Sequence, residues 1–134
     1  NHYDDSVAIK PALVVEMDTY RNLETLDSYF NAIHVKVQNV NGSIQVLDEV
    51  SKNIRHTDSI SIGGLWIKYD GVTLSVSHDA TRLSATPPAH IVSEALVLDG
   101  FFDPNEVVYV GFTSGTGGET DTHEVWSWTI KQEL

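Results

Sequence analysis

Apolar residues recur along this 134-residue chain in short runs, many of which alternate with polar residues. Val, Ile, Thr, Trp and Tyr are frequent in these runs, which is typical of strands with one buried face. Turn-forming residues separate one run from the next. The pattern therefore predicts the strands Ala12–Asp18, Ala32–Gln38, Ser43–Leu47, Ser59–Tyr69, Thr73–His78, His90–Leu98, Val107–Thr113 and Glu124–Lys131.

Two pairs of turn residues indicate tight connections between predicted strands. Asp70-Gly71 stands between two apolar runs and predicts a two-residue hairpin, because type I′ turns need positive φ. Asn41-Gly42 is a weaker signal of the same kind, and the stretch 47–55 is compatible with a short helical turn. Short strands at this spacing predict an all-β protein, an antiparallel β-sandwich formed as one domain over residues 1–134.

Composition narrows the functions that such a sandwich can have. The chain has 8 Lys and Arg against 19 Asp and Glu, which gives a formal net charge of −11. Nucleic acid binding needs clustered Lys and Arg, so this partner is not expected, and anionic membrane surfaces are disfavoured for the same reason. The absence of cysteine excludes disulfides, thiolate metal sites and cysteine nucleophiles. The many carboxylates are instead compatible with a bound cation.

The first predicted strand carries the most informative polar residues. Glu16, Asp18 and Tyr20 are two residues apart, so they share one face of a strand. A cation between the two carboxylates would remove their repulsion, and His34 in the next strand would suit a transition metal such as Mn²⁺. The spacing alone leaves a second explanation open, namely a solvated polar face on an edge strand.

Three segments of the chain resemble the legume-type (L-type) lectins, the concanavalin A and pea lectin group. Residues 14–22 read VVEMDTYRN and resemble that family's metal-binding segment, V-x-V-E-[FL]-D-T-[YF]-x-N. Residues 108–118 (VYVGFTSGTGG) and 123–128 (HEVWSW) resemble two later motifs of the family, in the same order. The resemblance implies a concanavalin A-like jelly roll and carbohydrate binding without catalysis.

The resemblance also implies two neighbouring cation sites, one for Ca²⁺ and one for Mn²⁺ or another divalent transition metal. The implied metal ligands are Glu16, Asp18, Tyr20, Asn22, Asp27 and His34. Glu16 and His34 would bind only the transition metal, whereas the two aspartates would bridge the two cations. The backbone carbonyl of Tyr20 and the side chain of Asn22 would complete the Ca²⁺ site.

By the same resemblance, the metals would hold a loop in the shape that binds a glycan. Asn22 would donate its amide to a sugar hydroxyl, and Tyr20 would stack on the apolar face of the sugar ring. Gly117, Gly118 and Glu119 occupy the family's specificity loop, which contacts the sugar. An extracellular or secretory location is expected for such a protein.

One ligand position has two possible assignments. Counting onward from Asp27 as in concanavalin A reaches Ala32, which has no ligating atom, whereas the longer loop of pea-type lectins reaches His34. We favour His34 because the valines that follow it then match the family's isoleucine pair. Lys36 stands where the family has the glycine between that pair.

The length of the chain and these departures leave further alternatives. A sandwich of this family runs about 200–250 residues, and the chain begins only 15 residues before Glu16. We therefore expect the C-terminal portion of a lectin domain, completed by a partner chain or within a homo-oligomer. The alternative function is a lectin-fold interaction or assembly subunit with a degenerate sugar site. A glycosidase is disfavoured because Tyr20 and Arg21 stand where the second catalytic Glu would be.

Overall fold

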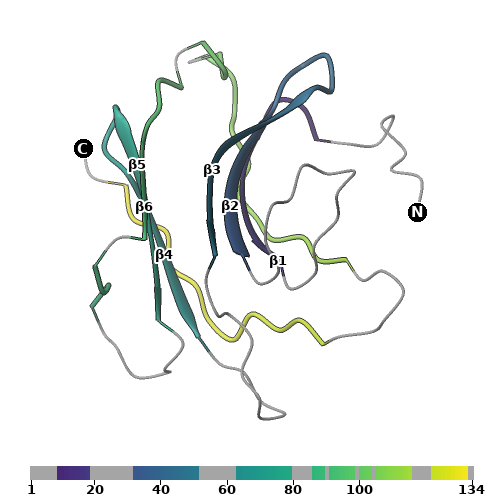
Figure 1. Cartoon of the computed structure of the whole chain (residues 1–134). Helices are drawn as coiled ribbons and strands as arrows, with labels where there is room; N and C mark the ends of the chain where they lie inside the picture. The colour runs from purple at the N-terminus through teal and green to yellow at the C-terminus, as the bar shows by residue number, and fades with distance from the viewer. Residues whose placement is uncertain are drawn as a thin grey trace. The chain divides into compact units, whose positions relative to one another are not determined.

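The structure is a computed structural model, shown in Figure 1, and it divides into two compact units. One unit comprises Asp4–Glu106, and the other comprises Asn1–Tyr3 with Val107–Leu134. Within the described residues there are strands and no helices, so none of them forms a helix that could span a membrane. The structure describes residues 9–18, 32–51, 63–79, 86–89, 91–98, 100–103, 105–115 and 122–132.

The first sheet of the larger unit is antiparallel and has the order β1-β2-β3 (Figure 1). β1 (Ala12–Asp18) and β2 (Ala32–Gln38) have the predicted bounds, and the first six residues of β2 are buried. β3 (Ile44–Ser51) is longer than predicted and takes up part of the stretch considered for a helical turn. Pairing with β2 overrides the local preference there, because it gives the backbone a complete ladder of hydrogen bonds.

The pairing of β2 with β3 contains one irregularity. His34 and Val35 lie opposite Glu49 and Asp48, but Lys36 lies opposite Val46. Leu47 of β3 therefore has no opposite residue in β2, and this extra residue forms a β-bulge.

The second sheet is also antiparallel and has the order β4-β5-β6, formed by Gly64–Tyr69, Thr73–Asp79 and Val92–Ala95. The predicted hairpin between β4 and β5 is confirmed, but its turn is centred one residue later than the predicted pair. The Asp70 N–H donates to the Thr73 carbonyl at 3.3 Å, so Gly71 and Val72 form the centre. Gly71 has a φ of 100°, which matches the requirement for glycine at the first central position of a type II′ turn.

The core of the larger unit is formed by both sheets. Ile33 and Val35 of β2 lie in one buried cluster with Leu74 and Val76 of β5 and with Val92 of β6. The two sheets therefore pack face to face, as in a β-sandwich. Successive residues of a strand point to opposite faces, so His34 and Lys36 project from the face of the first sheet that lies away from this cluster.

The strands predicted at residues 107–113 and 124–131 are not present. Both segments are described, but neither is paired in a ladder, and their side chains are largely exposed. Phe112 and Trp128 join the two segments by an edge-to-face ring contact with centroids 5.4 Å apart. Apolar alternation makes a segment suitable for a sheet, but a strand forms only where a neighbouring strand completes its hydrogen bonds.

Candidate metal centre

A row of polar side chains crosses the first sheet on the face away from the core. Glu16 in β1 lies opposite His34 in β2, and His34 lies opposite Glu49 in β3. Because cross-strand partners project from the same face, the sheet itself aligns these three side chains. The central member, His34, has no exposed surface in the structure.

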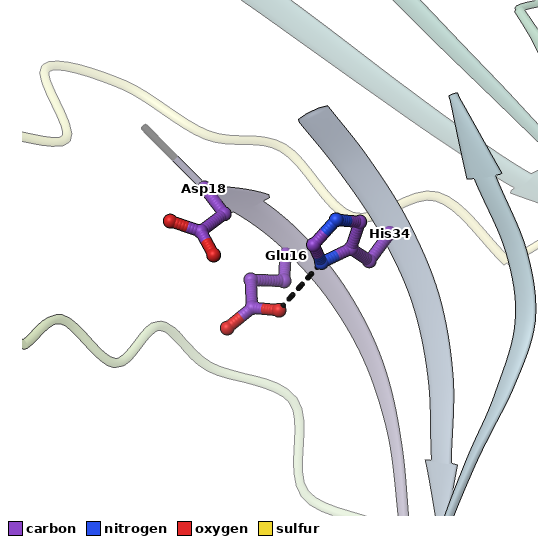
Figure 2. Close-up of side chains that lie close together, drawn as sticks. All are labelled: Glu16, Asp18 and His34. Carbon is purple, nitrogen blue, oxygen red and sulfur yellow. Dashed lines mark hydrogen bonds and ion pairs between the residues drawn. The ribbon is translucent and has the colours of Figure 1, made fainter. Parts of the chain in front are cut away.

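Both ring nitrogens of His34 face a carboxylate. Nδ1 is hydrogen-bonded to Glu16 Oε2 at 3.0 Å, the contact drawn as a dashed line in Figure 2. Nε2 lies 3.0 Å from Glu49 Oε1, at ion-pair distance but without the alignment of a hydrogen bond. The two flanking strands thus place one carboxylate beside each ring nitrogen of this buried imidazole.

Lys36 lies two residues after His34 and adds a positive charge to the same face. Its Nζ forms an ion pair with Glu16 Oε2, the oxygen that also contacts His34. Lys36 is itself buried, and a buried ammonium requires a counter-charge. Glu16 is therefore shared between an imidazole and an ammonium group.

These contacts keep Glu16 ionised. Its pKa lies below the usual carboxyl range, chiefly because of the hydrogen bond with His34. Burial acts in the opposite direction, and the Lys36 ammonium lowers the pKa further through its hydrogen bond and its charge.

Asp18 adds a second carboxylate beside Glu16 and His34. It follows Glu16 by two residues in β1, and ligand atoms of Glu16, Asp18 and His34 all lie within 4.8 Å of one another. Figure 2 shows the two acids on one strand with His34 reaching toward Glu16 from its neighbour. Two carboxylates and an imidazole are donors that suit a divalent transition metal such as Mn²⁺, and Asp18 also offers the oxygen that Ca²⁺ prefers.

Of the two candidates for the histidine ligand, His34 and Ala32, only His34 has a ligating side chain, and the sheet brings it beside Glu16 and Asp18. Ala32 lies opposite Asp18 at the end of the ladder and is buried, but it has no ligating atom. The side chain that sequence reasoning preferred is therefore the one that the sheet brings to Glu16.

Sequence reasoning missed two members of this cluster, Glu49 and Lys36. Glu49 lies in the stretch that is compatible with a short helical turn, so local pattern does not predict its pairing with His34. The resemblance marks Lys36 only as a lysine at a position where the family has glycine. The i, i+2 spacing of His34 and Lys36 is the signal that places both on one face of the sheet.

The rest of the predicted site lies outside the described residues. This holds for three metal ligands and for the specificity loop, namely Tyr20, Asn22, Asp27, Gly117, Gly118 and Glu119. Their roles stay predictions, whereas Glu16, Asp18 and His34 have described positions.

Known proteins are similar to this chain along nearly its whole length. The legume lectin domain family matches residues 1–133. The L-type lectin-domain containing receptor kinase VIII.1 of Arabidopsis thaliana is 28% identical over 123 residues, which cover 91% of this chain and 16% of the relative. The probable L-type lectin-domain containing receptor kinase II.1 of the same species is 26% identical over 151 residues, which cover 98% of this chain and 22% of the relative.

A third relative comes from rice. The L-type lectin-domain containing receptor kinase SIT2 of Oryza sativa subsp. japonica is 25% identical over 138 residues, which cover 98% of this chain and 20% of the relative. The chain thus spans only about a fifth of the length of these curated relatives.

Proposed function

Because this chain belongs to the legume lectin domain family, we propose that it binds carbohydrate without catalysis, at a site organised by Ca²⁺ and a divalent transition metal. The observation that carries the proposal is the cluster of Glu16, Asp18 and His34, whose ligand atoms lie within 4.8 Å of one another. We further propose an extracellular or secretory location, which agrees with the names of the relatives as receptor kinases.

The protein's part in this function is to hold the donors in place. Glu16 and His34 are fixed by the pairing of β1 with β2 and are proposed to bind the transition metal. Asp18 is the last residue of β1, so a cation bound there would restrain the segment that follows it. The bound cations would supply positive charge and fixed geometry, and no bond-breaking step is assigned to them.

The segment after Asp18 contains the residues proposed to complete the site. Asp27 would share both cations with Asp18, and the Tyr20 carbonyl and Asn22 would bind Ca²⁺. Asn22 would also donate its amide to a sugar hydroxyl while the Tyr20 ring stacks on the sugar. By the resemblance to the family motif, Gly117, Gly118 and Glu119 would contact the sugar as part of the specificity loop.

Calorimetric titration of the metal-stripped chain with Mn²⁺ and Ca²⁺ tests the metal half of this proposal. We expect binding of both ions, with Mn²⁺ lost in Glu16→Gln and both ions weakened in Asp18→Asn. Asp70→Asn removes an acid of the β4–β5 turn and serves as the matched control, which should bind like the native chain. Failure of the native chain to bind either ion at millimolar concentration would refute the metal site.

A glycan array with and without EDTA tests the sugar half. We expect glycan binding that EDTA abolishes and that Asn22→Ala removes while the far-ultraviolet circular dichroism spectrum stays unchanged. Native-like glycan binding by a folded Asn22→Ala variant would refute the assigned sugar contact.

A second candidate function is an interaction or assembly module whose sugar site is degenerate. Exposed aromatic residues in the smaller unit favour it, since Tyr109 is 89% exposed and Trp126 is 56% exposed. A stable oligomer by light scattering, combined with no ligand on the glycan array, would select this function over the first.

A further inference from the structure

Lys36 carries a positive charge into the candidate metal centre. In the described part of the first sheet, its Nζ is paired with Glu16 Oε2, and that oxygen also contacts His34 Nδ1 at 3.0 Å. Glu16 and His34 are two of the proposed transition-metal ligands. An ammonium group therefore holds a carboxylate oxygen that the metal would need.

The sheet explains why the Lys36 ammonium reaches this oxygen. Lys36 lies opposite Val14 in β1 and Val46 in β3, so its directly opposed neighbours are apolar. Glu16 is its diagonal neighbour, because Glu16 lies opposite His34 two residues earlier. Diagonal neighbours are within reach of long side chains, and the methylene stem of a lysine packs well on apolar groups.

We propose that the Lys36 ammonium is a tethered cation that stabilises Glu16 in the metal-free chain, and that a transition metal must displace it to bind. The inference rests on the proposed metal function and deepens it by naming the residue that sets the affinity.

The charges of the cluster give the physical reason. Glu16, Asp18 and Glu49 surround His34, and like charges at such distances repel unless a cation lies among them. Lys36 supplies that cation without any metal. A divalent ion entering beside Glu16 would meet the repulsion of the ammonium, so Lys36 weakens transition-metal binding. Ca²⁺, for which Glu16 is not a proposed ligand, would be affected less.

Removal of the charge at Lys36 tests the proposal. Lys36→Met keeps the apolar stem, Lys36→Gln is a polar neutral alternative if the first variant folds poorly, and Lys36→Arg keeps the charge. Calorimetric titration of each metal-stripped variant with Mn²⁺ should show about tenfold tighter binding, or more, for the neutral variants only. Lys68→Met, at an exposed residue of β4, is the matched control and should bind Mn²⁺ like the native chain.

The outcomes separate this inference from the function on which it rests. Equal Mn²⁺ affinity in the native and neutral forms overturns the role of Lys36 and leaves the metal site standing. If no form binds Mn²⁺, the transition-metal site is refuted, and a double-mutant cycle of Lys36→Met with Glu16→Gln in EDTA decides the role of Lys36. A coupling of about tenfold in the unfolding equilibrium constant supports the tethered cation, and additive effects overturn it.

Discussion

His34 shows how a single side chain connects the sheet with the proposed chemistry. The imidazole is fully buried and lies 3.0 Å from one carboxylate on each side, Glu16 and Glu49. A histidine that binds a metal through one nitrogen usually has a carboxylate or carbonyl at the other, which fixes the orientation of the ring. Glu49 is in position for this orienting role when a cation lies on the Glu16 side.

At the residue scale, the ionised Glu16 predicts how the stability of the fold changes at acidic pH. Its pKa is lower in the folded chain than in an unfolded one, chiefly through the hydrogen bond with His34. The resulting stabilisation is complete above the ordinary glutamate pKa of about 4.3 and is lost as the pH falls through the lowered value. We expect Glu16→Gln to show a shallower loss of thermal midpoint below about pH 4.3 than the native chain.

The control for this measurement is Glu106→Gln, which removes one negative charge at an exposed position. Thermal midpoints recorded by circular dichroism from neutral to acidic pH compare the two variants. If the thermal midpoint of Glu16→Gln falls with decreasing pH as steeply as that of the native chain, the contact between Glu16 and His34 does not contribute the expected stability.

The strands show which parts of the fold are predictable from local pattern. β1 and β2 were predicted to the residue, because their apolar runs end at clear polar or turn residues. The later part of β3 was not predicted, since Asp48 and Glu49 interrupt its apolar pattern and only the ladder with β2 makes it a strand. Glu16, Asp18 and His34 lie on the two strands that local pattern predicts, and the family resemblance groups them, whereas Glu49 lies in the part of β3 that only the ladder with β2 makes a strand.

At the element scale, the β4–β5 turn predicts a specific cost for a side chain at Gly71. Its φ of 100° is one that other residues rarely adopt, and an added Cβ would meet no atom within 4 Å. The cost of Gly71→Ala is therefore conformational, about 1–2 kcal/mol of unfolding free energy. Urea denaturation measures it.

Gly100→Ala is the matched control, because a Cβ there also meets nothing within 4 Å and no positive φ is required. We expect a change of no more than about 0.5 kcal/mol, or slight stabilisation. Equal destabilisation by both substitutions would show that the backbone of Gly71 is not strained by alanine.

For the molecule as a whole, stability depends on a core that neither sheet can form alone. Leu74 is 1% exposed in the cluster shared by both sheets, whereas Val72 in the adjacent turn is 62% exposed. We expect Leu74→Ala to lower the free energy of unfolding by about 2–5 kcal/mol. Val72→Ala should change it by no more than about 0.5 kcal/mol.

Urea titration followed by tryptophan fluorescence provides both values for the core prediction. A small effect of Leu74→Ala, comparable with that of Val72→Ala, would contradict a core shared between the sheets. The local pattern predicts strands at 107–113 and 124–131, yet neither described segment is paired in a ladder, because pairing depends on a partner strand that local pattern does not specify.

The bulge between Val35 and Lys36 also determines which changes of chain length the polar row can tolerate. In a regular ladder, a slip of two residues returns every side chain to its own face but gives it a different cross-strand partner. The bulge marks one alignment of β2 with β3 and thereby keeps Glu49 opposite His34. Insertions in the exposed turn around Asn41 should therefore leave the polar row intact. Deletion of Asp48, which lies between the bulge and Glu49, would move Glu49 away from His34 and break the row.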